Sequence, residues 1–244
     1  MALGSCCIQG YIHEGTPKGS FEELNGVRTY VALPSGEYDK TKAILFLTDI
    51  FGTELNNGKL LADSFAANGF AVYMPDYLNG DPIAKEDMNS GKVQLQDWFK
   101  NHGPEQTRPP LDKAVAAIKE KGVTTFGAIG YCLGARYTVD LIYAEVVSVG
   151  VVAHPSLLES PKDIEELNKS SAHFLWLNAL EDYMFNKEKQ EEAKKITAGN
   201  DKHKHVDFEG GHGFAIRGDP SDAKIRGEAD RAFEEAVNWF KAHL

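Results

Sequence analysis

Short apolar runs recur along the chain and alternate with segments in which apolar residues return every three or four positions. The runs are continuous rather than alternating, which is typical of strands buried on both faces of a parallel sheet. They predict strands over Thr29–Leu33, Ala43–Thr48, Phe70–Met74, Thr125–Ile129, Val146–Ala153, Phe174–Asn178 and His205–Phe208. This alternation of strands and helices indicates an α/β protein with a doubly wound or related open sheet.

Three of the intervening segments have the spacing of amphipathic helices, with an apolar stripe on one face. The stripes are Leu61 and Phe65, then Leu111, Val115 and Ile118, and finally Ala232, Ala236, Trp239 and Phe240 within 223–244. Gly69 and Gly122 follow the first two stripes, where glycine commonly ends a helix. No internal repeat or linker-like change of composition interrupts the alternation, so we expect residues 1–244 to form one domain.

The composition is that of a globular protein with a full apolar core. Hydrophobic residues make up 42% of the chain and charged residues 25%, and the formal net charge is −10. This acidic balance, without a basic face, argues against a nucleic-acid partner. No apolar run approaches the roughly 18–20 residues that cross a bilayer, and the N-terminus lacks the basic start of a secretory signal. We therefore expect a soluble, cytoplasmic protein without a membrane partner.

The chain has three cysteines, Cys6, Cys7 and Cys132. An odd and sparse count does not make a disulfide framework, and two adjacent cysteines do not easily bridge each other. We interpret Cys6 and Cys7 as partly covered thiols of an N-terminal arm. The alternatives are a metal site or a palmitoylation site, although no zinc-type spacing is completed nearby.

The stretch GAIGYCLGARYTVD, at 127–140, places Cys132 between a predicted strand and a predicted helix. Gly130 and Gly134 flank it in a pattern that permits a sharp turn and close packing of the helix on the strand. Such a nucleophile elbow presents its central residue at a helix N-terminus, whose partial positive charge favours a thiolate. The alternative is a structural cysteine, because cysteine is among the most often buried residue types.

A cysteine nucleophile needs a base, and the base needs a group that orients it. Asp182 follows the predicted strand in HFLWLNALEDYMF, and His212 follows the one in HVDFEGGHGFAIRGD. Nucleophile, acid and histidine is the order of the α/β-hydrolase triad, with each residue after a different strand. Taken separately, Asp182 could cap a helix near Asn186 and His212 could be a loop histidine. Glu181 competes with Asp182 for the acidic role.

An oxyanion hole in this arrangement combines the backbone N–H that follows the nucleophile with one from the loop after an early strand. The first of these belongs to Leu133. The loop in AILFLTDIFGTE supplies the second, and we predict Ile50 as its donor. Gly52, two residues later, leaves room for the backbone to approach a ligand.

Together these motifs resemble the dienelactone hydrolase family, a cysteine-using branch of the α/β-hydrolases. The matching pieces are TDIFG at 48–52, MPDYL at 74–78, GYCLGA at 130–135, EDYMF at 181–185 and GGHGFAIRG at 210–218. The N-terminal CCIQG and the AHPS at 153–156 are more similar to fungal and other eukaryotic members. The resemblance implies an α/β-hydrolase fold, with a mostly parallel central sheet and helices on both faces. It also implies the triad Cys132, Asp182 and His212, backbone donors at Ile50 and Leu133, and no metal or organic cofactor.

Two departures from the bacterial members of that family bear on the substrate. Those enzymes carry a glutamate just before the IFG loop, where this chain has Asp49, which either tunes the protonation of the thiol or caps the loop. They also bind a substrate carboxylate with two arginines, of which one has no counterpart here. The other falls at Ile216, with Arg217 displaced by one residue. Arg217 is a candidate for binding an anionic group, or for a surface ion pair with Asp219 or Asp222.

His154 follows a predicted strand and is expected at the same edge of the sheet as Cys132. It is a candidate for binding substrate or polarising a carbonyl, or else a structural histidine before Pro155. The sequence therefore predicts a carboxylic ester or lactone hydrolase of the carboxymethylenebutenolidase type, acting through a thioacyl-enzyme as a monomer or weak homodimer. The alternatives are acyl transfer to another acceptor, and a non-catalytic or redox-sensing protein with a reactive Cys132.

Overall fold

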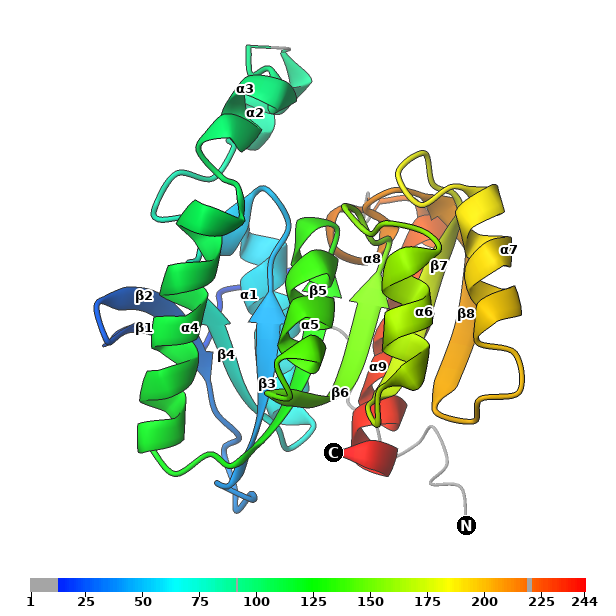
Figure 1. Cartoon of the computed structure of the whole chain (residues 1–244). Helices are drawn as coiled ribbons and strands as arrows, with labels where there is room; N and C mark the ends of the chain where they lie inside the picture. Colours follow the sequence, from blue (N-terminus) through cyan, green and yellow to red (C-terminus); the bar gives the residue numbers. More distant parts are fainter. Residues whose placement is uncertain (1–12, 91, 219–220) are drawn as a thin grey trace.

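The computed structural model describes residues 13–90, 92–218 and 221–244, so that Cys6 and Cys7 lie outside the described residues. Over these residues the chain forms an eight-stranded sheet in the order β1-β2-β4-β3-β5-β6-β7-β8 (Figure 1). The strands are β1 Ser20–Leu24, β2 Val27–Ala32, β3 Lys42–Leu47, β4 Ala71–Pro75, β5 Thr125–Tyr131, β6 Val147–Ala153, β7 His173–Glu181 and β8 His203–Gly211. β2 runs antiparallel to β1 and β4, and the strands from β4 to β8 are parallel. The predicted mostly parallel sheet is confirmed.

Helices cover both faces of the sheet. They are α1 Asn56–Ala67, α2 Lys85–Asn89, α3 Leu95–Lys100, α4 Pro104–Glu120, α5 Leu133–Tyr143, α6 Lys162–Lys169, α7 Lys187–Ile196, α8 Phe214–Arg217 and α9 Ala223–His243, with a 3-10 turn, η2, at Gly52–Glu54. Helices α4 to α7 pack on one face, and α1, α8 and α9 pack on the other. Helices α2 and α3 instead form an arm that stands above the carboxyl ends of the strands (Figure 1).

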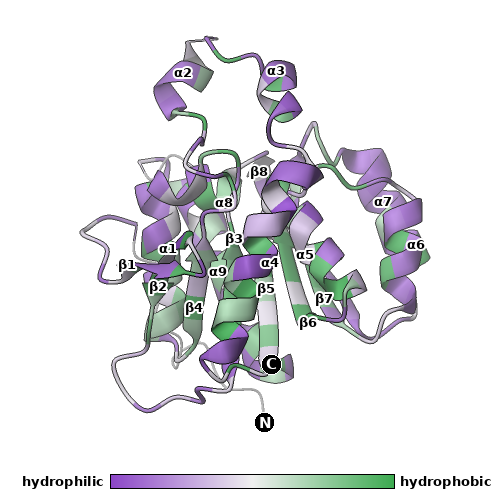
Figure 2. Cartoon of the chain, turned by 60° about the vertical axis from the view of Figure 1, so that its left-hand side comes forward, coloured by the Kyte–Doolittle hydropathy of each residue, from purple (hydrophilic) through white to green (hydrophobic). Residues whose placement is uncertain are grey.

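The central strands are apolar on both faces, which explains their continuous hydrophobic runs. In β3, Leu45 and Leu47 belong to the core under α4 and α5, whereas Ile44 and Phe46 belong to the core under α1 and α9. All four side chains are fully buried, and each such side chain contributes about 1.5–3 kcal/mol to folding. Figure 2 shows hydrophobic residues gathered on the central strands and hydrophilic ones on the outer helices.

The structure also contains elements that the hydrophobic pattern did not predict. β1 is an edge strand in which only Leu24 is buried, so it has no continuous apolar run. Helices α2 and α3 are short and polar, and they lack the repeated stripe that identifies a longer helix. The predicted C-terminal helix is confirmed as α9. Across the described residues, no helix combines the length and the apolar character that a bilayer span requires.

The carboxyl edge of the sheet gathers the candidate functional residues. Asp49 follows β3, Cys132 follows β5, His154 follows β6, Asp182 follows β7 and His212 follows β8. These strands are neighbours and run in the same direction. Their ends therefore bring together side chains that are widely separated in the sequence, as expected for a ligand site in an open parallel sheet.

Candidate active site

Cys132 lies at the turn between β5 and α5, in a backbone conformation that residues other than glycine seldom adopt. Its φ is 51° and its ψ is −111°, a strained combination of the kind found at functional sites. The turn leaves no room for a side chain at either flanking glycine. A Cβ on Gly134 would lie 2.1 Å from the carbonyl oxygen of Leu47, and one on Gly130 would lie 2.3 Å from that of Gly134. The turn thus holds Cys132 at the N-terminus of α5.

His212 and Asp182 meet across the ends of β8 and β7. The Nδ1 atom of His212 lies 3.0 Å from both Oδ1 and Oδ2 of Asp182, and the two side chains are 4% and 1% exposed. Oδ1 of Asp182 also accepts hydrogen bonds from the N–H groups of Met184 at 2.7 Å and Phe185 at 3.2 Å. Glu181 is exposed to solvent. Asp182, and not Glu181, is therefore the carboxylate that contacts the imidazole.

The loop that carries Asp182 is fixed by α7. Asn186, rather than Asp182, caps this helix with its side chain. Nε2 of Gln190 donates hydrogen bonds to the carbonyl oxygens of Ala179 and Phe185, each at 2.7 Å. Gln190 is buried and ties the end of β7 to the far side of the loop. Gln190 could not be recognised from the sequence, because one glutamine in a polar helix carries no recognisable pattern.

Opposing effects set the protonation of His212. Burial disfavours the charged imidazolium and acts to lower its pKa. Hydrogen bonds with Asp182 and Cys132, together with attraction to both groups, outweigh burial and raise the pKa of His212 to about 9. Because Nδ1 is engaged by Asp182, Nε2 is the ring nitrogen available to the thiol. The site therefore favours an imidazolium beside the Cys132 sulfur.

The backbone donors predicted for the oxyanion hole are buried and unengaged. Among the described residues, no acceptor is found for the N–H of Ile50 or of Leu133. The loop that carries Ile50 is held in place by its neighbours: the carbonyl of Ile50 accepts a hydrogen bond from the N–H of Ile83 at 2.9 Å, and the N–H of Phe51 donates to Oδ1 of Asp49 at 3.0 Å. Fixed, unpaired N–H groups of this kind can stabilise a developing oxyanion.

Asp49 is buried and forms an ion pair with Arg217. Nε of Arg217 lies 2.8 Å from Oδ2 of Asp49, although its N–H is not directed at the oxygen as in a hydrogen bond. Burial raises the pKa of Asp49, and the charge of Arg217 opposes that rise. The guanidinium also lies over the ring of Phe51, 5.0 Å from its centroid. Arg217 thus faces the site, while Asp222 caps α9 and Asp219 lies outside the described residues.

His154 is fully buried against His212. The two ring centroids are 5.0 Å apart in an edge-to-face arrangement. In the described part of the chain, neither ring nitrogen of His154 has a hydrogen-bond partner. Burial, together with the charges of His212 and Arg217, lowers the pKa of His154 well below its ordinary value, which keeps the ring neutral. Because the ring is fully buried, the geometry favours packing on the imidazole of His212 over direct contact with a substrate.

A cavity of about 380 Å³ opens beside His212. Its lining combines apolar side chains such as Phe214 with two cations, Arg217 and Lys85. Lys85 and Met88 reach the cavity from α2, in the arm that stands above the strand ends in both views (Figures 1 and 2). Neither residue could be recognised from the sequence, because only the position of the arm brings them to the site.

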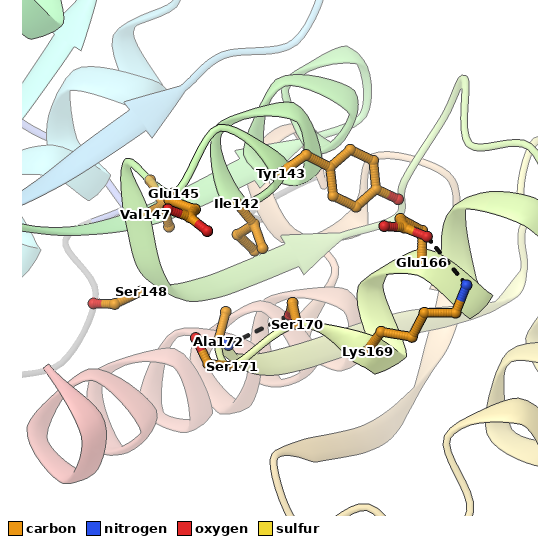
Figure 3. Close-up of a pocket in the computed structure, with 10 residues that line it drawn as sticks. All are labelled: Ile142, Tyr143, Glu145, Val147, Ser148, Glu166, Lys169, Ser170, Ser171 and Ala172. Carbon is orange, nitrogen blue, oxygen red and sulfur yellow. Dashed lines mark hydrogen bonds and ion pairs between the residues drawn. The ribbon is translucent and has the colours of Figure 1, made fainter.

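A larger cavity, of about 490 Å³, lies at the opposite edge of the sheet (Figure 3). It is formed where α5 and α6 end and where β6 and β7 begin, and it contains the ion pair of Glu166 with Lys169 at 3.2 Å. None of its lining residues follows the carboxyl end of a strand, where open parallel sheets bind ligands. We therefore assign the candidate active site to the smaller cavity. No cluster of side chains suited to a metal ion is found among the described residues.

Comparisons with known proteins give a consistent family and fold. The model of the dienelactone hydrolase family matches residues 27–244. Hydrolase pyvD of Aspergillus violaceofuscus is 36% identical over 98% of this chain and 96% of its own length. Dienlactone hydrolase 1 of Gibberella moniliformis is 30% identical over 96% of this chain and 91% of its own length. The crystal structure of dienelactone hydrolase from Anabaena variabilis shares the fold, with a TM-score of 0.66 and 13% identity over 94% of this chain and 100% of the other.

Proposed function

Because this chain belongs to the dienelactone hydrolase family and is thus a hydrolase, we propose that it cleaves a small ester or lactone. Cys132 is the nucleophile, His212 the base, and Asp182 the group that orients the base. The observation that carries the proposal is the contact of His212 with Asp182 at 3.0 Å, combined with the interaction of His212 with Cys132 that helps to raise the pKa of the imidazole. A nucleophile, a base and an orienting carboxylate in series are the parts that acyl transfer requires.

In the first half of the reaction, the thiol proton of Cys132 passes to Nε2 of His212. The thiolate then attacks the substrate carbonyl carbon and forms a tetrahedral intermediate with a carbon–sulfur bond. As the intermediate collapses, the bond from carbon to the leaving oxygen breaks, and the proton held on Nε2 goes to that oxygen. The products of this half are a thioacyl-enzyme and an alcohol, which for a lactone remains part of the same molecule.

In the second half, His212 removes a proton from a water molecule that attacks the thioester carbonyl. The carbon–sulfur bond breaks, the carboxylic acid is released, and the proton on His212 returns to Cys132. Asp182 stabilises the imidazolium in both halves, which is consistent with the raised pKa of His212. The complete cycle regenerates the free enzyme and consumes one water molecule for each ester cleaved.

The N–H groups of Ile50 and Leu133 are proposed to hold the oxyanion of both tetrahedral intermediates. Their support is that both are buried and that neither is engaged among the described residues. Donors of this kind contribute roughly 3–4 kcal/mol each to lowering the barrier. They are backbone groups, so side-chain substitution does not remove them.

Arg217 and Lys85 are proposed to bind an anionic group of the substrate, since both line the cavity beside His212. The ion pair with Asp49 holds Arg217 in place and limits the charge that it offers to a ligand. Asp49 also affects the protonation of the site, because its negative charge attracts the imidazolium of His212. His154 acts differently: as a neutral ring packed on His212, it excludes water from the imidazole.

The test of the nucleophile is Cys132→Ala assayed with an activated ester such as p-nitrophenyl acetate. Turnover is expected to fall by at least about a thousandfold, because the attacking group is lost. The Cys6→Ala/Cys7→Ala double variant is the control for loss of a thiol elsewhere, and it should retain wild-type turnover. In the wild type, mass spectrometry after an acid quench should find one acetyl group on the peptide that contains Cys132. Undiminished turnover by Cys132→Ala would refute the assignment.

A redox sensor is the main alternative from a different class of function. Sensor thiols are accessible and often have a resolving cysteine nearby. Cys132 is 7% exposed, and it is the only cysteine among the described residues. The buried, triad-like surroundings favour catalysis over oxidation. Acyl transfer to an acceptor other than water uses the same first half-reaction, and adding alcohols or amines to the assay and identifying the products distinguishes it from hydrolysis.

A further inference from the structure

Ser156 lies beside the nucleophile, on the segment that follows β6. Its hydroxyl oxygen is 3.6 Å from Sγ of Cys132, a distance suited to a hydrogen bond with the large sulfur atom. Ser156 is 4% exposed, so water has little access to this contact. In the described part of the chain, its hydroxyl has no second hydrogen-bond partner. The hydroxyl proton is therefore available to the sulfur.

Backbone hydrogen bonds bring the two residues together. The N–H of Cys132 donates to the carbonyl of Ala153 at 3.2 Å, and the N–H of Ser156 donates to the carbonyl of Cys132 at 3.1 Å. Between them, His154 has a φ of 40° and donates its N–H to the carbonyl of Leu177 at 3.1 Å. The main chain thus folds back toward the elbow and sets the position of Ser156. Replacing serine with alanine removes the hydroxyl without removing any of these bonds.

We propose that Ser156 is a further catalytic residue, whose hydroxyl donates a hydrogen bond to the Cys132 thiolate and favours its formation. The proposal rests on the proposed function, in which Cys132 gives its proton to Nε2 of His212 and attacks as a thiolate. A serine hydroxyl can accept a hydrogen bond from a thiol or donate one to a thiolate, and the bond to the charged sulfur is the stronger. Ser156 therefore stabilises the thiolate more than the thiol.

The ionisable groups around the sulfur do not replace this donor. His212 supplies a positive charge, but its Nε2 is also the group that receives the thiol proton. Burial raises the pKa of Tyr77 well above its usual value, so this side chain stays uncharged. His154 is neutral and faces the ring of His212, and Asp49 acts on His212 from the end of β3. All four groups remain in a Ser156 variant, so a comparison with the wild type isolates the hydroxyl.

The test is the pH dependence of the alkylation of Cys132 by iodoacetamide. A Cys6→Ser/Cys7→Ser background leaves Cys132 as the single thiol of the chain. In Ser156→Ala, the midpoint of the profile is expected to rise by about one pH unit, so that alkylation below the midpoint is about tenfold slower. The ultraviolet absorbance of the thiolate should shift in parallel. The limiting rate at high pH should be at least as fast as in the wild type, because the thiolate has lost a hydrogen bond.

Two further variants separate the hydroxyl from general effects on folding. Ser156→Thr keeps a hydroxyl and should keep the wild-type midpoint. Ser64 is a fully buried serine in α1 whose hydroxyl donates to the carbonyl of Leu60 at 2.7 Å, and Ser64→Ala should leave the profile unchanged. Coincident profiles for the wild type and Ser156→Ala would overturn the proposal. Equal shifts in Ser156→Ala and Ser64→Ala would also overturn it.

The alkylation experiment is independent of ester hydrolysis. If Cys132→Ala hydrolyses p-nitrophenyl acetate as fast as the wild type, the proposed function fails, whatever the alkylation profiles are. If that variant is inactive but the profile of Ser156→Ala coincides with that of the wild type, Cys132 remains the nucleophile and Ser156 has no role in its ionisation. The two proposals can therefore fail separately.

Discussion

Nε of Arg217 lies 2.8 Å from Oδ2 of Asp49, and the side chain of this aspartate is only 1% exposed. The ion pair joins the loop after β3 to α8, the two segments that border His212 on the side of the cavity. A carboxylate removed from water to this extent depends on its partner to remain charged. Removing either charge of the pair is therefore expected to change both the free energy of unfolding and the charge beside His212.

Arg217→Gln is expected to destabilise the protein, because it leaves the Asp49 carboxylate buried without its cation. The expected loss is about 3 kcal/mol of unfolding free energy at neutral pH, measured by urea denaturation. The loss should shrink as the pH falls. Burial already raises the pKa of Asp49, so the folded state takes up a proton at a higher pH than the unfolded state does, and this uptake removes the buried charge.

The double variant Asp49→Asn/Arg217→Gln is the control for this prediction, because it removes both charges. It should recover most of the stability that Arg217→Gln loses, and its stability should depend less on pH below neutrality. If the double variant were as unstable as Arg217→Gln at every pH, the loss of stability would not come from an unpaired charge on Asp49.

Asp182→Asn is expected to lower kcat/KM for an activated ester by about 10³–10⁴-fold. An amide cannot stabilise the imidazolium, and it can hold the ring of His212 in the wrong tautomer. Glu181 is the adjacent carboxylate and is exposed, so Glu181→Gln is the matched control and should retain near wild-type activity. A comparable loss in both variants would contradict the distinct role of Asp182.

The stability difference between the wild type and Asp182→Asn is expected to depend on pH. The pKa of His212 rises from its ordinary 6.5 to about 9 in the folded state. A group whose folded pKa is raised stabilises the protein fully below the unfolded pKa, and this contribution is lost as the pH rises through the folded pKa. The difference, roughly 2 kcal/mol at pH 6, should therefore narrow as the pH rises above about 6.5 and be largely lost above about 9. A stability difference that grows as the pH rises would mean that Asp182 does not raise the pKa of His212.

Lys85 lines the cavity from α2 and is exposed. Lys85→Gln is expected to raise KM for an ester that carries a carboxylate by about three- to fivefold, the size of an exposed charge interaction. Its kcat should be unchanged, and neutral esters should be unaffected. The control is Lys92→Gln, which removes a lysine of the same arm that pairs with Asp87 at 3.1 Å. If KM rose equally for charged and neutral esters, Lys85 would have no specific role in binding anionic groups.

The strands of the sheet could be predicted from the sequence, because they depend on local features, and the order of the proposed triad residues could be read from the same segments. Buried parallel strands leave continuous apolar runs, and Cys132, Asp182 and His212 each follow such a run by three or four residues. β1 escaped prediction because it is an edge strand with one buried residue, Leu24. The termini of β7 and β8 extend beyond their apolar runs for a related reason: pairing with a neighbouring strand, rather than burial, keeps those ends extended.

The contacts around the triad could not be predicted, because they depend on which loops become neighbours. Asp49 and Arg217 are far apart in the sequence, and only the packing of α8 beside the end of β3 brings them together. Ser156 reaches Cys132 because Tyr131 of β5 is in register with Ala153 of β6. No residue pattern encodes that register by itself.

The arm formed by α2 and α3 inserts between β4 and α4 and contributes Lys85 and Met88 to the cavity. It contains no member of the proposed triad and neither of the proposed oxyanion donors. In the proposed mechanism, the arm therefore supplies part of the cavity wall but none of the reacting groups. If the proposed mechanism holds, substitutions or exchanges confined to the arm should change which substrates fit the cavity while the reacting groups stay intact, which would make the arm a replaceable specificity module.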